Sequence, residues 1–258
     1  MSHRHHEEID RAVLLARKAV GGGRVEDPAK LTRLLYRHWF LGRRPLAAVP
    51  QQRRSQSSVT DRASVVTGAP ASAGSGCAQP WRTWGRLWTE DRPCRGSDLV
   101  RLYLSCAPHT SLHAVAAVTA AAREWDHPWL LTSRALHQPV PGPDATVLYL
   151  PVDALAELRQ PVEEMLVELK PFLASTVPAL TLEVARGAAL AQNPADGRSY
   201  GVHRCSVVAA TVLANRSHHH REVIERTFSA LRDAGVDPQH PYRALGASWE
   251  WDARVRAA

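Results

Sequence analysis

The sequence predicts an α+β fold, in which a mostly antiparallel sheet is flanked by helices and preceded by a helical N-terminal segment. Three observations indicate this class. Past residue 81, short apolar runs typical of strands alternate with longer stretches of helical periodicity. The first 40 residues carry helical periodicity alone. The residues between these two parts carry no sustained periodicity, which is typical of a linker or a long loop.

We expect residues 1–46 to form N-terminal helices. The first helix covers residues 2–19, where Ser2 can act as the cap, and a run of three glycines ends it. The second helix covers residues 28–40 and carries leucines on one face.

Residues 47–80 are expected to form a flexible linker or long loop, because Ser, Ala, Arg, Gln, Pro and Gly dominate there. Trp81, Trp84 and Trp88 follow at spacings of three and four. This spacing places them along one side of a short helix or on a cross-strand surface. A core patch or a partner-facing patch is favoured over a platform for stacking bases.

Residues 81–258 are expected to form one α+β domain. Pro161 should interrupt one of its helices, because proline removes a backbone donor, and Gly235 should end the last one. The strands are expected at residues 100–105, 129–131, 145–150 and 179–185, and the helices at 110–125, 153–173, 199–215 and 218–234.

The charge of the chain is basic and comes mostly from arginine. The formal net charge of the 258 residues is +7, and lysine occurs only at positions 18, 30 and 170. This excess suits an anionic substrate or an acidic partner, although a GC-rich genome alone produces the same usage. The sequence has neither the spacing of a zinc finger nor an RNA-recognition signature, so we do not expect nucleic acid as a partner.

The cysteines and histidines indicate neither a metal site nor a redox site. The four cysteines contain no CxxC pair, and without a signal peptide we interpret them as reduced thiols of a cytoplasmic protein. Three adjacent histidines at 218–220 point in three directions on a helix, so they cannot share one ion. No apolar run approaches the roughly 20 residues of a membrane span. We expect no metal, no cofactor and no membrane partner.

The densest group of polar side chains lies in residues 186–205, RGAALAQNPADGRSYGVHRC. A turn is followed at once by the expected start of a helix, whose first N–H groups are unpaired. The helix dipole adds partial positive charge there, so the segment suits a bound anion. Arg204 offers a fork of donors that matches phosphate oxygens, and His203 can move a proton near neutral pH.

This segment resembles the HopA-type family, which is named for a plant-pathogen type III effector. The family pattern, approximately PG-x-GLA-x-DP-x-x-G-x-SFG-x-HRC, becomes here Gly187, Ala191, Asn193-Pro194, Gly197, Ser199-Tyr200-Gly201 and His203-Arg204-Cys205. The family's VRVY, DAAVLYLP and TPALT elements resemble VRLYL at 100–104, DATVLYLP at 144–151 and VPALT at 177–181. The resemblance covers roughly residues 99–245 in the right order.

The resemblance implies a reaction and two partners. Relatives in thioamitide and class V lanthipeptide biosynthesis are associated with eliminating phosphate from serine or threonine of a ribosomal precursor peptide, which leaves dehydroalanine or dehydrobutyrine. A separate kinase-like protein, similar to aminoglycoside phosphotransferases, adds the phosphate. This chain has no Gly-rich loop with a following lysine and no HRD or DFG motif, so it cannot phosphorylate the peptide itself.

Such a β-elimination needs guanidinium groups for the phosphate dianion, a base for the α-proton and an acid for the leaving group. Arg204 is the first candidate for phosphate, and His203 is the candidate acid or, alternatively, orients the turn. We expect both near the opening of a basic pocket. Further phosphate contacts are expected from Arg101, Arg134, Arg186, Ser199 and Gly201.

Three of these assignments have structural alternatives. Arg101 can simply face solvent by strand alternation, and Arg134 can be an ordinary surface arginine. Ser199 is also the expected cap of the helix that follows it.

The base does not stand where the resemblance puts it. The family's lysine aligns with Thr132, which cannot abstract an α-proton unaided. Either His137 or Tyr200 is the base, or this copy is catalytically impaired. The sequence therefore predicts a phosphoserine/phosphothreonine lyase, with a non-catalytic protein that binds peptide or stabilises the kinase as the alternative. A third interpretation, an effector that acts on host targets, rests on the family name alone.

Overall fold

A computed structural model describes most of the chain outside one long internal stretch. The expected linker at 47–80 lies outside the described residues, as do Ser2, Trp81 and Trp88. The described residues are 3–23, 25–42, 82–86, 98–106, 110–133, 142–249 and 251.

Within these residues the strands form one six-stranded sheet in the order β1-β3-β4-β2-β6-β5. Every neighbouring pair is antiparallel. The expected α+β class with an antiparallel sheet is confirmed. The strands are β1 (Arg82–Arg86), β2 (Leu99–Leu104), β3 (Trp129–Ser133), β4 (Thr146–Pro151), β5 (Leu182–Ala185) and β6 (Ala188–Gln192).

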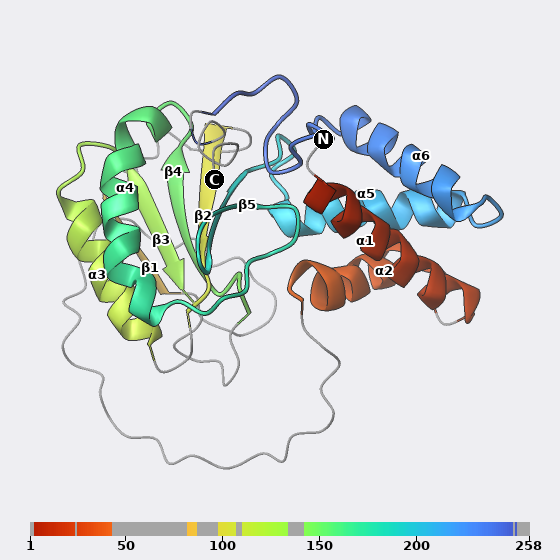
Figure 1. Cartoon of the computed structure of the whole chain (residues 1–258), viewed down its shortest axis with the longest axis horizontal. Helices are drawn as coiled ribbons and strands as arrows, with labels where there is room; N and C mark the ends of the chain where they lie inside the picture. Colours follow the sequence, from red (N-terminus) through yellow and green to blue (C-terminus); the bar gives the residue numbers. More distant parts are fainter. Residues whose placement is uncertain are drawn as a thin grey trace, which may run out of the picture.

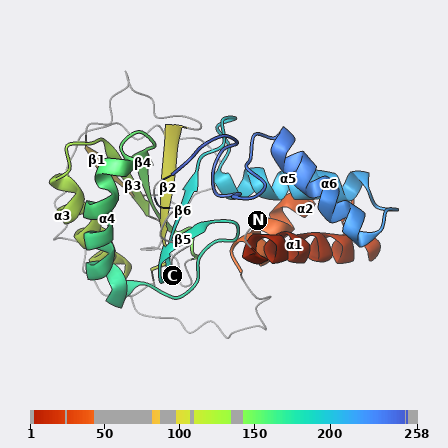
Figure 2. The ribbon, with the colours of Figure 1, turned by 45° about the horizontal axis from the view of Figure 1, so that its top comes forward.

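Helices cover both faces of this sheet. Helices α3 and α4 lie on one side of it, whereas α1, α2, α5 and α6 gather on the other (Figures 1 and 2). The π-helix η1 continues directly from α2. The helical elements are α1 (His3–Gly21), α2 (Pro28–Leu35), η1 (Tyr36–Phe40), α3 (Ser111–Arg123), α4 (Leu155–Leu169), η4 (Lys170–Phe172), α5 (Tyr200–Ala214) and α6 (His220–Asp233).

The central strand β2 separates two apolar cores. Val100, Leu102 and Leu104 pack in the core that contains α3 and α4. Tyr103 packs instead in the core that contains α1, α2 and α5. Because side chains alternate along a strand, Arg101 shares the second face with Tyr103. Everything on that face of β2 is therefore directed at the helical layer and not at open solvent.

The structure differs from the sequence-based expectation at several elements. Strand β1 was not among the expected strands, and it pairs Trp84 with Leu131 of β3, which agrees with the cross-strand interpretation of this tryptophan. Strand β6 was not expected, because its alanine-rich residues follow a glycine and precede a turn. Gly187 adopts a φ of 74°, which allows the tight turn between β5 and β6. Pro161 lies inside α4 without interrupting it, so the expected break is wrong. Burial of Leu158 and Val162 on either side of the proline offsets the lost backbone hydrogen bond.

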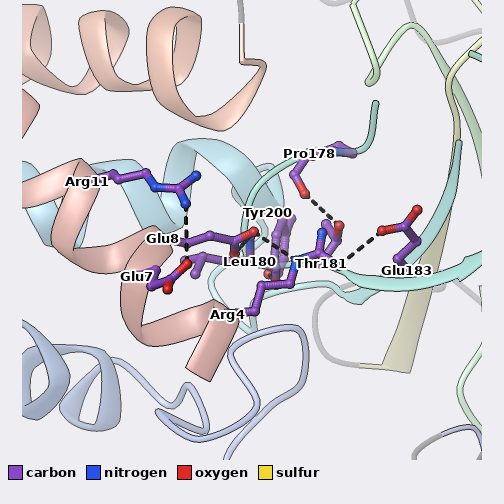
Figure 3. A network of polar contacts seen from close by, with 9 residues as sticks. All are labelled: Arg4, Glu7, Glu8, Arg11, Pro178, Leu180, Thr181, Glu183 and Tyr200. Carbon is purple, nitrogen blue, oxygen red and sulfur yellow. Dashed lines mark hydrogen bonds and ion pairs between the residues drawn. The ribbon is translucent and has the colours of Figure 1, made fainter. Parts of the chain in front are cut away.

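Helix α1 is tied to the turn before β5 by a polar network (Figure 3). The Glu8 carboxylate accepts a hydrogen bond from the Leu180 N–H at 2.7 Å. Arg4 donates to Glu183 at 3.0 Å and to Glu8 at 3.3 Å. Leu180 has a φ of 60°, a strained value for a residue other than glycine. Burial raises the pKa of Glu8, and the Leu180 N–H opposes this shift.

Close packing of Phe40 against α5 joins η1 to the rest of the helical layer. Phe40 is 1% exposed, and its ring stacks on Tyr36 and contacts the rings of Tyr103 and Tyr200. A Cβ atom on Gly201 would lie 2.7 Å from Cδ1 of the Phe40 ring. The glycine at this helical position is therefore required by the approach of the ring.

The variant Gly201→Ala should lower the free energy of unfolding. Alanine improves helix propensity by about 1 kcal/mol, whereas overpacking a core costs about 1–3 kcal/mol. Because the added Cβ would lie under 3.0 Å from the Phe40 ring, the cost falls at the upper end of this range, and we expect a net loss of about 2 kcal/mol in urea denaturation followed by circular dichroism. Gly21→Ala is the matched control, because a Cβ at the end of α1 meets nothing within 4 Å. Equal urea midpoints for the two variants would contradict the tight packing of Phe40.

Candidate functional site

The start of α5 forms as the sequence predicts. Ser199 has an extended backbone with a ψ of 143°, and its hydroxyl accepts a hydrogen bond from the Val202 N–H at 3.4 Å. Gly197, with a φ of 74°, makes the turn that precedes it. Ser199 is thus the helix cap, and its contact with phosphate stays a prediction.

Arg204 lies in the interior and not at the expected mouth of a basic pocket. Its side chain is 2% exposed. Nε and Nη2 donate to the carbonyl of Pro241 at 3.4 and 3.2 Å, and the guanidinium carbon lies 4.3 Å from the centre of the Tyr200 ring. Burial lowers the pKa of Arg204. With its donors directed at the Pro241 carbonyl and at His203, Arg204 is placed to hold the loop at 241 against α5, and its role in phosphate binding stays a prediction.

His203 is also buried, with 3% of its surface exposed. Its Nδ1 lies 3.0 Å from Nη1 of Arg204, which can only donate, so Nδ1 is the acceptor and the proton resides on Nε2. Nε2 lies 3.7 Å from the Asp196 carboxylate. Burial, together with the charge of Arg204, lowers the pKa of His203 to about 4. A neutral imidazole with an occupied Nδ1 suits the alternative that His203 orients the turn.

Tyr200 is fully buried, and its hydroxyl is engaged by the backbone. It donates toward the carbonyls of Leu180 and of Pro241, the latter at 3.0 Å. Burial raises the pKa of the Tyr200 phenol. A phenol held in this way is poorly placed to serve as a base, and its catalytic assignment stays a prediction without a supporting contact.

The remaining predicted residues are dispersed. Arg186 is exposed at the turn between β5 and β6. Gly201 faces Phe40, as described above. Thr132 is half-buried on β3, and its hydroxyl donates to the Val147 carbonyl at 3.4 Å. Arg134 and His137 lie outside the described residues.

Arg101 is the predicted residue with the most unusual surroundings. It is half-buried on β2, where its register partners are Tyr149 of β4 and Ala191 of β6. Its Nε donates to the side-chain oxygen of Asn193, and its guanidinium carbon lies 5.1 Å from the centre of the Tyr149 ring. Burial alone would lower the pKa of Arg101, but the phenols of Tyr103 and Tyr149 raise it. The alternative that Arg101 faces solvent does not hold.

None of the contacts of Arg101 neutralises its charge. Asn193 contributes an amide, and Tyr103 and Tyr149 contribute phenols. Over the described ranges, no carboxylate lies within 4.0 Å of the guanidinium nitrogens. A buried charge without a counter-charge is costly, so this position suits a bound anion.

Two further groups border this position. Tyr36 of η1 donates its hydroxyl hydrogen to the Asp144 carboxylate at 2.5 Å, and Asp144 is 5% exposed in the turn before β4. Burial raises the pKa of Tyr103 to about 12, so its phenol remains protonated at neutral pH. We call the following residues the Arg101 cluster: Tyr36, Arg101, Tyr103, Asp144, Tyr149 and Asn193.

Sequence reasoning had not assigned the other members of the Arg101 cluster to the site. The sequence pointed to most of these residues, because VRLYL and DATVLYLP, which contain Tyr103, Asp144 and Tyr149, resemble elements of the family. Alternation in antiparallel strands puts Arg101 and Tyr103 on one face, and their register brings Tyr149 opposite Arg101. Tyr36 carried no signal, because it stands in a helical segment more than 60 residues before β2.

Neither a metal cluster nor a candidate membrane-spanning helix occurs in the described residues. They contain no group of three or more His, Cys, Asp or Glu side chains that could hold a metal ion. Of the adjacent histidines, His220 pairs with Asp10 at 2.6 Å. None of the helices in the described ranges is both long and apolar enough to span a membrane.

Comparison with known proteins gives one family match. The model of the HopA1 effector protein family matches residues 87–243, more than half of the chain. No protein with curated annotation shows significant sequence similarity to the chain.

The solved structures that are similar to the chain include two effector proteins. An effector protein from Pseudomonas syringae pv. tomato strain DC3000 shares 17% identity at a TM-score of 0.46, over 58% of each chain. An effector protein from Pseudomonas syringae pv. syringae strain 61 shares 15% identity at a TM-score of 0.45, over 60% of each chain. The matches span less than two thirds of either effector, and likeness at this level carries no functional argument.

The buried His203 should make stability depend on pH. Because its pKa is about 4 in the folded state and about 6.5 when unfolded, the unfolded chain binds more protons between these values. Its contribution is complete above pH 6.5 and is lost as the pH falls toward 4. In His203→Asn, whose amide oxygen can still accept from Arg204, the slope of unfolding free energy against pH should decrease in this window. Urea titrations at a series of pH values measure it, and an unchanged slope would contradict a buried, neutral His203.

Proposed function

The chain belongs to the HopA1 effector protein family, and we propose that it is a phosphoserine/phosphothreonine lyase. Its substrate is a ribosomal precursor peptide that a separate kinase-like protein has phosphorylated. Its products are inorganic phosphate and a peptide with dehydroalanine or dehydrobutyrine. The proposal takes the reaction from the resemblance to relatives in thioamitide and class V lanthipeptide biosynthesis. The kinase-like partner and a cytoplasmic setting are parts of the same proposal.

The half-buried charge of Arg101 is the observation that carries the proposal. Its neighbours Asn193, Tyr103 and Tyr149 solvate the guanidinium without neutralising it. A phosphate dianion is costly to desolvate unless fixed positive groups receive it. At Arg101 it would gain a forked donor and replace a missing counter-charge. Arg204 is the weaker candidate, because its donors already contact the Pro241 carbonyl and His203.

The phenols beside Arg101 have a defined part in the proposed reaction. The base takes the proton from Cα, the Cα–Cβ double bond forms and the bond between Cβ and the phosphate oxygen breaks. Arg101 then receives the charge that develops on the departing phosphate. Tyr103, whose pKa is about 12, stays protonated and can donate to a phosphate oxygen.

The pair formed by Tyr36 and Asp144 is our candidate for the base. The Tyr36 hydroxyl hydrogen already points at the Asp144 carboxylate at 2.5 Å. Transfer of this hydrogen to Asp144 would leave the phenolate oxygen free to take the α-proton. The pair thus replaces the family lysine, whose position is occupied by Thr132.

The alternative is a non-catalytic protein of the same pathway that binds the peptide or stabilises the kinase. Two observations favour it. Thr132 occupies the position of the expected lysine, and His203 has no open path to a substrate because it is 3% exposed. An Arg101 site that binds phosphopeptide without eliminating phosphate would fit this alternative.

Mass spectrometry of the precursor peptide tests the proposal. With the kinase-like partner and ATP alone, the peptide should gain phosphate; with this chain added, it should lose phosphoric acid and finish one water lighter than the unmodified peptide. In Arg101→Gln we expect elimination to slow by about 10²- to 10³-fold, the loss typical of a removed transition-state donor. Phosphorylated peptide should then accumulate.

Arg226→Gln is the matched control, because Arg226 is an exposed arginine on α6. It should eliminate phosphate at the native rate, and both variants should melt within a few degrees of the parent. Return of the peptide to its original mass would indicate hydrolysis and not elimination. Retention of the phosphate with the parent chain would favour the non-catalytic alternative, and native turnover by Arg101→Gln would show that Arg101 does not hold the leaving group.

A further inference from the structure

A groove runs between the helical segment α2–η1 and the first half of α5. It encloses about 860 Å³, which lies within the roughly 300–1,000 Å³ of ligand-binding pockets. The residues on each wall are spaced three or four apart, so each helix turns one face toward the groove. We call it the α2–α5 groove; it is lined by Thr32, Arg33, Tyr36 and Arg37 on one wall and by Arg198, Val202 and Ser206 on the other.

The rim of the α2–α5 groove is positively charged. Arg33 and Arg37 are exposed, and within the described part of the chain neither makes an ion pair. Arg198 is held in place by the Asp196 carboxylate at 2.5 Å and by the Ser206 hydroxyl at 2.8 Å. No acidic side chain belongs to the described lining. The N-terminal end of α5 adds partial positive charge to the same wall.

The floor of the groove is apolar. Val202, Val207 and Ala210 contribute to it from α5. Val202 keeps 37% of its surface exposed, although its neighbours in the first turn of α5 are buried. A basic rim over an apolar floor matches a ligand that carries both acidic and apolar side chains. Nucleic acid would satisfy the arginines but would leave the floor unused.

We infer that the α2–α5 groove binds an acidic, partly apolar segment of peptide. Tyr36 links this groove to the Arg101 cluster, because it is one of the lining residues and its hydroxyl donates to Asp144. A peptide seated in the groove would therefore present an adjacent phosphorylated residue to Arg101. The assignment of this segment to the phosphorylated precursor rests on the proposed lyase function. The binding of an acidic, partly apolar peptide in the groove does not depend on that function.

The family match covers only one wall of the groove. The family match begins at residue 87, whereas α2 and η1 end at Phe40. One whole wall of the groove, including Arg33 and Arg37, thus precedes the matched residues.

Fluorescence anisotropy with unphosphorylated probes tests the inference on the full chain. The first probe is a short labelled peptide of glutamate and leucine, the second replaces leucine by serine and the third replaces glutamate by lysine. We expect the first to bind, the second to bind at least about tenfold more weakly and the third not to bind. Val202→Glu and the double variant Arg33→Glu/Arg37→Glu should each weaken the first probe by about tenfold or more.

Two controls match these variants in chemistry. Val167 is 73% exposed on α4, on the opposite face of the sheet, so Val167→Glu adds the same charge elsewhere. Arg226→Glu reverses an exposed charge on α6. Both should change affinity by less than about twofold. Loss of affinity in the controls, native affinity in both groove variants, or equal binding of the serine probe or of a single-stranded oligonucleotide would overturn the inference.

The outcome is separable from that of the proposed function. The probes carry no phosphate, so a chain without lyase activity can still show the expected binding. Conversely, if Val202→Glu loses the glutamate–leucine probe but still eliminates phosphate from free phosphothreonine at the native rate, the result supports both the groove and the reaction site. It also shows that the two are separate. Elimination by the parent chain without any probe binding would overturn the inference that the groove binds peptide and would leave the lyase proposal standing.

Discussion

The contact of the Phe40 ring with α5 and β2 is the constraint on which the functional face depends. This one side chain meets the rings of Tyr36, Tyr103 and Tyr200, and it leaves no room for a side chain at position 201. The Phe40 carbonyl also accepts the Ala179 N–H at 3.0 Å. Because η1 is fixed by this ring, Tyr36 can reach Asp144 on one side and border the α2–α5 groove on the other.

The sequence predicted the fold class and most elements because their signals are local. The apolar run of β2 and the capping serine of α5 each lie within a few residues of the structure that they specify. Strand β6 escaped prediction because its alanines carry no strand preference, and only burial between β2 and β5 makes them a strand. The break expected at Pro161 was also wrong because tertiary packing overrides local preference. The packing of α4 on the sheet outweighs the helix-breaking tendency of this proline.

The candidate site was predicted less well, and the cause is burial. The polar residues at the start of α5 were recognised, but nothing local to that helix shows that Pro241 would cover Arg204. Arg101, by contrast, was expected to contact phosphate, although strand alternation alone left a solvent-facing position open. The burial of Arg101 depends on the helical layer that covers the second face of β2. Its hydrogen-bond partner is neutral because Asn193 stands where the family pattern has aspartate. With a neutral amide at that position, no carboxylate of the described residues lies within 4.0 Å of the guanidinium, a property that only the tertiary contacts reveal.

A crystal structure of the protein with O-phosphothreonine would test the central claim most directly, because it locates the anion without relying on turnover. The account predicts phosphate oxygens within hydrogen-bond distance of the Arg101 guanidinium and beside the Tyr149 ring, with Arg204 still bonded to the Pro241 carbonyl. Phosphate bound to Arg204 after displacement of the Pro241 carbonyl, or bound elsewhere while Arg101 keeps only its present neutral partners, would contradict it.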